Sequence, residues 1–310
     1  MTPGLMMSPA IDTNHALDHI DAAKRRMLGE VVERLRAVAG VSAIALGGSH
    51  ARGTHRPDSD LDVGLYYRDA HPFALADTRL VARGLAHCGE PVVTGLYEWG
   101  PWVNGGAWIE TAVGKVDFLY RSLDQVGNTI GAAQAGEWHH NFDQQPPFGF
   151  RSVIYLAETA CCIALFDPMG ELARLKREVA TYPEALKRRI VGDSLWCAEF
   201  SLRFAEDFAR RTEVLECAGC LTRIGSYLVQ ALFALNGTYF INDKGAARTI
   251  ESFVSRPVNF NERVAAIAGH PGTRTAELAE TVSRMAALWH ETVLLAGPYY
   301  QQRFDLAALK

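Results

Sequence analysis

Long apolar runs are missing from this 310-residue sequence. Runs such as IALG and VLLAG fall far short of the ~20 apolar residues that a membrane-spanning helix requires. The N-terminal stretch MTPGLMMSPAIDTNH also lacks the basic segment and apolar core of a secretory signal. We therefore expect a cytoplasmic protein with no membrane partner.

Cysteines and basic residues are scarce as well. Six cysteines in a chain of this length, two of them adjacent, do not form the framework of a disulfide-rich secreted domain. Lys and Arg number 31 against 35 Asp and Glu, which gives a formal net charge of −4, and no long basic stripe occurs. Because binding of extended nucleic acid rests first on phosphate neutralisation, we expect no such partner. A cationic small molecule fits better, since residues 1–150 hold 17 acidic and 12 basic side chains.

Apolar periodicity divides the chain into two parts. Within residues 1–125, short apolar runs alternate with helical patterns, which predicts a sheet of roughly four or five strands with helices beside it. The expected helices cover residues 14–38 and 73–87, and the expected strands cover residues 41–46, 61–67, 91–97, 107–111 and 115–120. Past residue 125 no convincing strand follows, and long helical patterns take over. The expected fold class is therefore α+β, with an N-terminal mixed-sheet domain over residues 1–125, a linker over 126–147 and an all-helical domain over 148–310.

The stretch LGGSHARGTHRPDSDLDVGLYY, residues 46–67, carries the first candidate site. Asp60 and Asp62 are one residue apart in a strand pattern, so their side chains project to the same face. Like charges in this arrangement repel unless a cation lies between them. Because Mg²⁺ is held by one or two carboxylates together with substrate phosphates, the pair predicts a site for a metal–nucleotide complex.

Two further features extend this site. Gly47 and Gly48 let backbone N–H groups approach an anion closely, and the Ser49 hydroxyl adds a donor. Asp117 lies mid-strand among apolar neighbours, where an unpaired charge is unfavourable. Beside the other carboxylates it would complete a metal triad or take a proton from an attacking hydroxyl.

This combination resembles the DNA polymerase beta-like nucleotidyltransferase superfamily. The superfamily pattern is an apolar residue, then Gly and Gly or Ser, then about ten residues, then Asp-apolar-Asp-apolar. Here it reads Leu46-Gly47-Gly48-Ser49 followed by Asp60-Leu61-Asp62-Val63, with Asp117 at the third acidic position. Ala51-Arg52-Gly53 and Ser59 are similar to bacterial small-substrate members, which include aminoglycoside and lincosamide nucleotidyltransferases. The resemblance covers residues 41–121.

The resemblance implies a polymerase beta-like catalytic domain that uses Mg²⁺, as two ions, and ATP or another NTP. Asp60, Asp62 and Asp117 would form the catalytic and metal-binding set. Gly47, Gly48, Ser49, Arg52 and Ser59 would bind the nucleotide. By analogy with members whose helical domain contributes a lysine to the triphosphate, Lys244 would assist, with Tyr239 and Asn236 as weaker companions. Asp117 is the candidate base, and Glu110 on the partner strand is the alternative.

These implications predict an enzyme that transfers NMP, in the first place AMP from ATP, to a hydroxyl of a small molecule such as a cationic antibiotic. Two alternatives stay open: nucleotidylation of a protein acceptor, as in toxin–antitoxin members, and nucleotide binding without turnover. The run from Glu98 to Trp108 holds three tryptophans, and it is either a packed loop or an aromatic wall for a base or an acceptor. The sequence fixes neither the preferred NTP nor the oligomeric state.

Overall fold

The computed structural model describes residues 16–304, which form two compact units. The first unit holds the described residues up to Ile130 together with Tyr155–Thr181. The second holds Gly131–Ile154 and the described residues from Tyr182 onward. We assigned residues 155–181 to the helical domain from the sequence, whereas in the structure they pack in the first unit. The chain therefore crosses between the units more than once.

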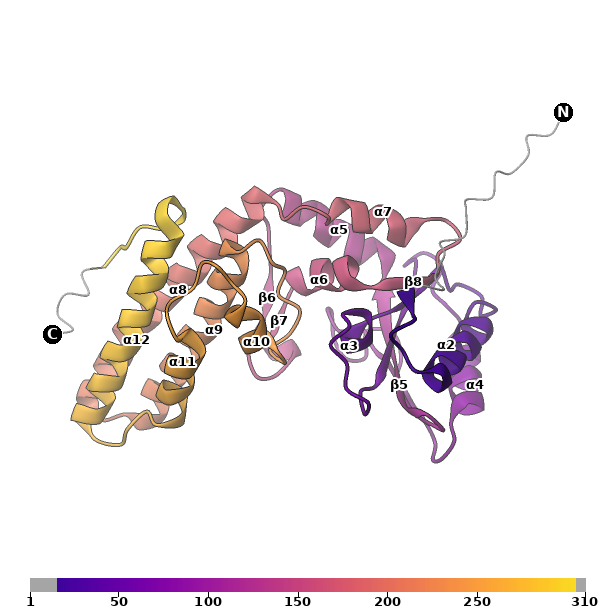
Figure 1. The fold of residues 1–310 in the computed structure, drawn as a ribbon, viewed down its shortest axis with the longest axis horizontal. Helices are drawn as coiled ribbons and strands as arrows, with labels where there is room; N and C mark the ends of the chain where they lie inside the picture. The colour runs from indigo at the N-terminus through magenta and orange to yellow at the C-terminus, as the bar shows by residue number, and fades with distance from the viewer. Residues whose placement is uncertain (1–15, 305–310) are drawn as a thin grey trace. The chain divides into compact units, whose positions relative to one another are not determined.

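A six-stranded mixed sheet is the centre of the first unit (Figure 1). The strand order is β3-β4-β5-β2-β1-β8, in which β2 and β5 are parallel and the other neighbours are antiparallel. The strands are β1 (Ala43–Leu46), β2 (Leu61–Tyr67), β3 (Val92–Val93), β4 (Gly106–Thr111), β5 (Gly114–Ser122) and β8 (Ile163–Phe166). With the helical second unit, this sheet confirms the predicted α+β class.

Alternation along the strands gives the sheet one fully buried face. In β2, Leu61, Val63 and Leu65 are buried, while Asp62 and Gly64 between them are less so. The buried set packs with α2 (Ala22–Leu35) and α4 (Leu75–Leu85) in one hydrophobic core. In β2 and β5 the opposite face of the sheet carries Asp62 and Asp117.

The predicted start of the first helix at Asn14 lies outside the described residues.

Three short strands, β6 (His140–Asn141), β7 (Phe150–Arg151) and β8, correct the prediction that no strand follows residue 125. The helix α6 (Val153–Cys161) ends one residue before β8, which pairs with β1 at the edge of the sheet. The run CCIALF is short and apolar throughout, so its periodicity does not distinguish a strand from the end of a helix. Pairing with β1, a contact distant in sequence, decides the structure here.

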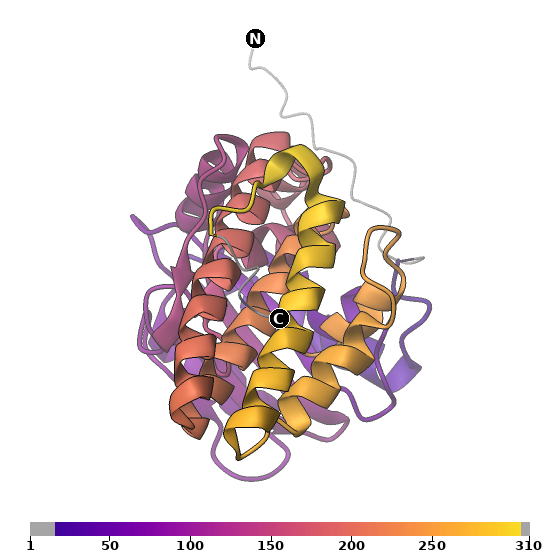
Figure 2. The same cartoon turned by 90° about the vertical axis from the view of Figure 1, so that its left-hand side faces the viewer.

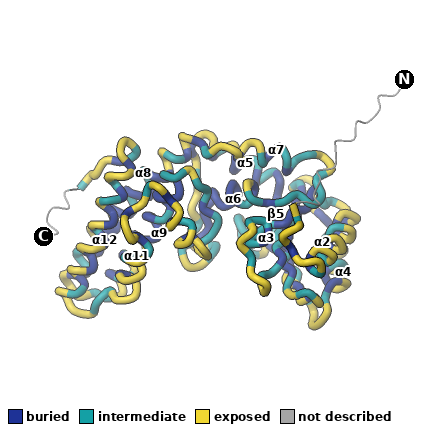
Figure 3. The backbone as a smooth tube through the Cα atoms, viewed as in Figure 1, coloured by how far each residue is buried: buried dark blue, intermediate teal, exposed yellow. Residues whose placement is uncertain are grey.

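Three long helices dominate the second unit: α8 (Glu184–Arg211), α9 (Val214–Leu235) and α12 (Thr275–Ala296). They contact one another pairwise and run side by side (Figure 2). Buried positions recur along each of them, as Figure 3 shows in dark blue. By length and composition α9 could cross a membrane, but most of it is buried inside the unit, as in the core helix of a soluble protein.

The remaining elements are short. They are α3 (Gly48–Ala51), α5 (Leu123–Gln134), β6 (His140–Asn141), η1 (Phe142–Gln144), β7 (Phe150–Arg151), α7 (Glu171–Glu178), α10 (Ala246–Glu251), α11 (Phe260–Gly269) and η2 (Gly297–Tyr299). The strands β6 and β7 form a separate two-stranded sheet.

Candidate active site

The parallel pairing of β2 with β5 brings two predicted carboxylates together. Asp62 lies directly opposite Asp117 in the register of these strands. Both side chains are on the polar face, because their neighbours along each strand are buried. Asp60 precedes the first residue of β2, and its side chain is 45% exposed. The structure thus gathers all three predicted acidic residues at one end of these two strands.

The predicted phosphate-binding turn contacts this cluster. The N–H of Gly47 donates to the carbonyl oxygen of Asp62 at 2.8 Å. Gly48 has a φ of +59°, and a Cβ there would lie 1.7 Å from Asp62 Oδ2. Only glycine fits this position, for its backbone conformation and for the close approach of the carboxylate. The turn that begins at Gly47 and Gly48 therefore lies against Asp62.

Burial and mutual repulsion perturb the carboxylates. Burial, and after it the charges of Asp117 and Asp60, together raise the pKa of Asp62 to about 6. Burial also raises the pKa of Asp117, although the neighbouring Lys115 opposes this shift. Carboxyl groups whose charges repel in a partly desolvated place are typical of metal-binding and acid–base sites.

Lys115 is a member of the cluster that the sequence did not reveal. Its Nζ donates to Asp117 Oδ2 at 3.1 Å and lies 3.8 Å from Asp60 Oδ2. Burial lowers the pKa of Lys115, but the hydrogen bond and charge of Asp117 outweigh this effect, and the net shift is upward. The spacing Lys-x-Asp within one strand was the available signal, because it places both side chains on one face. The lysine supplies a positive charge where the sequence predicts a metal ion.

The chemical type of these donors suits a divalent cation such as Mg²⁺. Carboxylate oxygens are its preferred protein ligands, and the buried Oδ1 of Asp117 has no hydrogen-bond partner. Among residues 16–304, however, no group of three His, Cys, Asp or Glu side chains stands close enough together to hold a metal ion. The ammonium group of Lys115 is hydrogen-bonded to Asp117 in this structure. Binding of a metal ion at these carboxylates would require the ammonium group to move away.

Three other predicted residues lie near the turn or the hairpin. Arg52 Nε donates to the carbonyl oxygen of Gly48 at 3.2 Å, which places its side chain beside the turn. The Ser59 hydroxyl accepts from the backbone N–H of Arg56 at 2.8 Å, so in this structure it stabilises the loop. Glu110 is exposed on β4, opposite Lys115. Nucleotide contacts of Arg52 and Ser59 stay predictions.

The predicted residues of the helical domain lie in the second unit. Lys244 is exposed in the segment between α9 and α10. Tyr239 stacks on Tyr182, with ring centroids 4.7 Å apart, and burial raises its pKa to about 12. Asn236 exchanges hydrogen bonds with the backbone of Ser255 and so has a structural role. The contribution of Lys244 and Tyr239 to triphosphate binding stays a prediction.

Beyond the carboxylates, a second ion pair that the sequence did not indicate joins the sheet to α6. Arg121 lies in β5, two residues after Leu119 and on the same face of the strand. It is 4% exposed and forms two hydrogen bonds with Glu158 of α6, each 2.8 Å long. A cavity of about 30 Å³ next to this pair extends to Gly48 and Gly64 and could hold a single water molecule. Two charges 37 residues apart in sequence carry no local signal of their pairing.

Comparison with known proteins assigns the N-terminal part of the chain. Residues 25–93 match the family model described as a nucleotidyltransferase domain, and residues 154–244 match a domain of unknown function, DUF4037. A nucleotidyltransferase-like protein from Exiguobacterium sibiricum 255-15 is structurally similar, with a TM-score of 0.44 and 9% identity over 90% of this chain and 78% of that one. No curated protein matches. The match over residues 25–93, which contain the turn and the Asp60–Asp62 pair, indicates a nucleotidyltransferase domain in this part of the chain.

Proposed function

We propose that this protein is a cytoplasmic, Mg²⁺-dependent nucleotidyltransferase that transfers NMP, with AMP from ATP as the first candidate, to a hydroxyl of a small molecule. The observation that carries the proposal is the juxtaposition of Asp62 and Asp117 on parallel strands, with the glycine turn against Asp62. The family match supports nucleotidyl transfer as the reaction class.

Each group in the site has a role in this proposal. Asp60, Asp62 and Asp117 would hold Mg²⁺, which when bound neutralises the charge on the nucleotide phosphates. The backbone of Gly47 and Gly48 approaches the outer phosphates, and the Ser49 hydroxyl donates to them. Asp117 accepts the proton of the attacking hydroxyl.

A small acceptor is favoured by charge. The chain has a formal net charge of −4, whereas a protein that binds an extended nucleic acid neutralises many phosphates with Lys and Arg. A cationic molecule would be attracted to the acidic first half of the chain. Nucleotide binding without turnover is the competing function, and the Lys115–Asp117 ion pair in the site favours it.

Thermal unfolding with each of the four NTPs, with and without Mg²⁺, tests the proposal. A ligand that binds only the native state at a hundred times its dissociation constant stabilises it by about 2.7 kcal/mol. We expect a Mg²⁺-dependent shift with one nucleotide, lost in Asp62→Asn. Asp58→Asn is the matched control, because it removes the same charge from an exposed position in the preceding loop.

Release of pyrophosphate then separates the two functions. An enzyme releases pyrophosphate from the preferred NTP when the right acceptor is present, whereas a nucleotide sensor never does. Loss of the thermal shift in Asp58→Asn as well as in Asp62→Asn would show that general charge, not the carboxylate site, controls binding. Absence of a shift with any NTP would contradict the proposed function.

A further inference from the structure

The β4 strand adds an aromatic side chain to the row of catalytic candidates. Trp108 lies directly opposite Asp117 in the antiparallel pairing of β4 with β5. Its strand neighbours Ala107 and Ile109 are fully buried, so Trp108 is on the polar face with Asp117. The Trp108 side chain is 45% exposed, which is high for the largest apolar residue. A little under half of the Trp108 surface is thus exposed beside the carboxylates.

Trp99 doubles this aromatic surface. Its ring stacks on Trp108 with centroids 5.1 Å apart and an interplanar angle of 28°. A Cβ at Gly106 would lie 2.0 Å from the carbonyl oxygen of Phe118 and 3.0 Å from the Trp99 ring, so the glycine allows both to lie this close to the strand. Gly106 and Trp108 are on the same face of β4, two residues apart. We call Trp99 and Trp108 the tryptophan wall.

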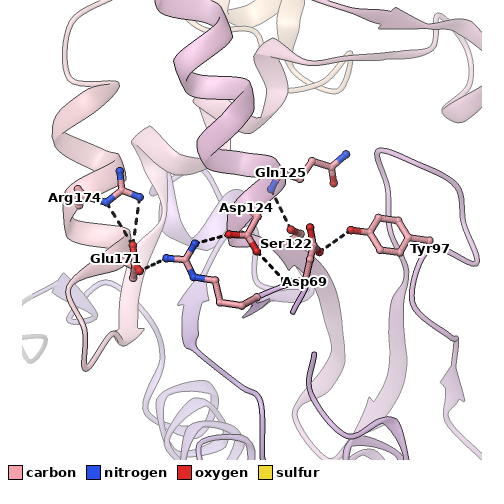
Figure 4. Close-up of polar contacts among 8 residues, drawn as sticks. Asp69, Tyr97, Ser122, Asp124, Gln125, Glu171 and Arg174 are labelled. Atoms are coloured by element: carbon pink, nitrogen blue, oxygen red, sulfur yellow. Dashed lines mark hydrogen bonds and ion pairs between the residues drawn. The ribbon is translucent and has the colours of Figure 1, made fainter. Parts of the chain in front are cut away.

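The loop that carries Trp99 is held in place before any ligand binds. The Tyr97 hydroxyl donates to Asp69 at 3.0 Å, and the backbone N–H of Asp69 donates to Asp124 at the start of α5 (Figure 4). Further along the loop, the Gln125 amide donates to the carbonyl oxygen of Pro101 at 2.6 Å. A surface fixed in this way loses little entropy on binding a ligand. The wall is therefore preorganised.

The order of strands decides which substrate the wall meets. Across the sheet the sequence is β4 with Trp108, β5 with Asp117, β2 with Asp62, and β1, which leads into the glycine turn. Neighbouring strands are about 4.8 Å apart, so the wall and the turn lie on opposite sides of the carboxylates. In an in-line displacement the attacking and leaving oxygens are on opposite sides of the phosphorus. If the turn binds the leaving pyrophosphate, the acceptor approaches from the side of the wall.

We propose that the tryptophan wall forms the acceptor subsite, and that the acceptor is a ring-bearing alcohol that packs a flat face, aromatic or the C–H face of a sugar, on Trp108. The inference rests on the proposed function. The acceptor hydroxyl loses its proton to Asp117 and bonds to the α-phosphorus, while the bond from that phosphorus to pyrophosphate breaks. Lys115 Nζ lies 5.6 Å from the centre of the Trp108 ring and already makes a cation–π contact with it, so the acceptor packs on the part of Trp108 that Lys115 and Trp99 leave exposed.

The test uses phenyl β-D-glucopyranoside as a ring-bearing probe and sorbitol as a polyol without a ring. Both are titrated into protein labelled with ¹⁵N at tryptophan, with Mg²⁺ and α,β-methylene-ATP present. We expect the glucoside to shift the indole N–H signals of Trp99 and Trp108 and to leave Trp289, buried in the second unit, unchanged. Sorbitol should shift none of them. Signals are assigned with Trp99→Phe and Trp108→Phe.

Substitution of Trp108 separates an acceptor wall from a nucleotide wall. Trp108→Ala should weaken glucoside binding by about tenfold, because a stacked ring and its buried area are lost. Trp108→Phe should retain most of the affinity. Binding of the ATP analogue should be the same in all three proteins. Trp108 is exposed, so we expect the fold to tolerate its replacement, and the Phe variant tests this directly.

Three results would overturn the inference. They are an unchanged spectrum on adding the glucoside, equal binding of sorbitol, and loss of affinity for the nucleotide analogue instead of the glucoside in Trp108→Ala. The last would assign the wall to the nucleotide base. Failure of the analogue to bind even the wild-type protein would count against the proposed function, and the glucoside titration without nucleotide would still decide whether the wall binds a ring.

Discussion

Asp62 makes the stability of the protein depend on pH. Its pKa is raised to about 6 by burial and by the charges of Asp117 and Asp60. The folded protein therefore retains a proton that the unfolded chain releases near pH 4. Without metal, the free energy of unfolding should fall between about pH 4 and about pH 6, by at most about 3 kcal/mol. Asp62→Asn removes this loss and should be the more stable protein at about pH 7, as urea unfolding can measure.

Asp58→Asn is the control, because Asp58 is exposed in the preceding loop. Its stability should follow that of the wild type across the same pH range. If the free energy of unfolding of Asp62→Asn varies with pH as that of the wild type does, Asp62 has the same pKa in the folded and the unfolded protein. Its burial then does not affect the pH dependence of stability. Addition of Mg²⁺ should stabilise the wild type above pH 6 and leave Asp62→Asn unchanged.

Lys115 competes with a metal ion for Asp60 and Asp117. Lys115→Met removes the ammonium group and keeps the length of the side chain, so the carboxylates repel one another more strongly. We expect the metal-free variant to lose about 1 kcal/mol of stability, a small amount because the lysine is 32% exposed. We also expect it to bind Mn²⁺ several-fold more tightly, as measured by electron paramagnetic resonance of the free ion.

Lys115→Arg provides the matched comparison, because it keeps the positive charge beside Asp117. Its affinity for Mn²⁺ should stay near that of the wild type. Weaker binding of Mn²⁺ in Lys115→Met would mean that Lys115 assists metal binding and does not compete with it.

At the scale of the elements, local patterns predicted the strands better than their partners. The alternation in β2 and the hairpin of β4 and β5 are visible in the sequence, and so are the candidate roles of Asp62 and Asp117. The pairing of β2 with β5, which sets these two residues opposite each other, joins segments 55 residues apart and has no local signal. The same holds for β8, which a short apolar run could not distinguish from a helix end.

The tryptophan run shows the same limit. Its composition left a packed loop and an exposed wall equally open, and the phase of β4 against β5 determines that Trp108 is beside Asp117. Lys115 and the pairing of Arg121 with Glu158 became visible only with the sheet register and the position of α6. Long-range contacts, not propensity, therefore complete this site.

Helix α6 is joined to the sheet by the ion pair of Arg121 and Glu158. The Arg121 side chain is 5% exposed and that of Glu158 is 26% exposed. Removal of one partner leaves a buried charge uncompensated, so Glu158→Leu should lose about 3–5 kcal/mol of stability. The double variant Arg121→Met/Glu158→Leu should recover most of this loss, because apolar side chains of similar size can replace a buried pair. Urea unfolding of the wild type, both single variants and the double variant gives the coupling energy.

The exposed pair of Arg34 and Glu30 is the control for charge removal. Its side chains are 41% and 46% exposed, and Glu30→Leu should change stability by less than about 1 kcal/mol. If the double variant of α6 is as unstable as Glu158→Leu, the loss comes from packing at position 158 and the ion pair is not its cause.

At the scale of the whole molecule, each unit has its own hydrophobic core. Phe118 is fully buried in the sheet of the first unit. Trp289 of α12 is 1% exposed in the second unit, where its indole N–H donates to the carbonyl oxygen of Leu195 at 3.1 Å. Composition and periodicity anticipated a mixed-sheet part and a helical part. The return of residues 155–181 to the first unit depends on β8 and could not be read from either.

Two separate cores predict two unfolding transitions in calorimetry, since a domain with its own core unfolds as a unit. Phe118→Leu should lower only the transition of the first unit, and Trp289→Phe only that of the second, each by about 1–3 kcal/mol in stability. The carboxylates and the glycine turn belong to the first unit, so Mg²⁺ with the preferred NTP should raise the transition that Phe118→Leu lowers. If the nucleotide raises both transitions equally, residues of the second unit such as Lys244 take part in binding, and Lys244→Ala should then restore a shift confined to the first unit. A single transition that both variants lower would show that the two cores unfold together.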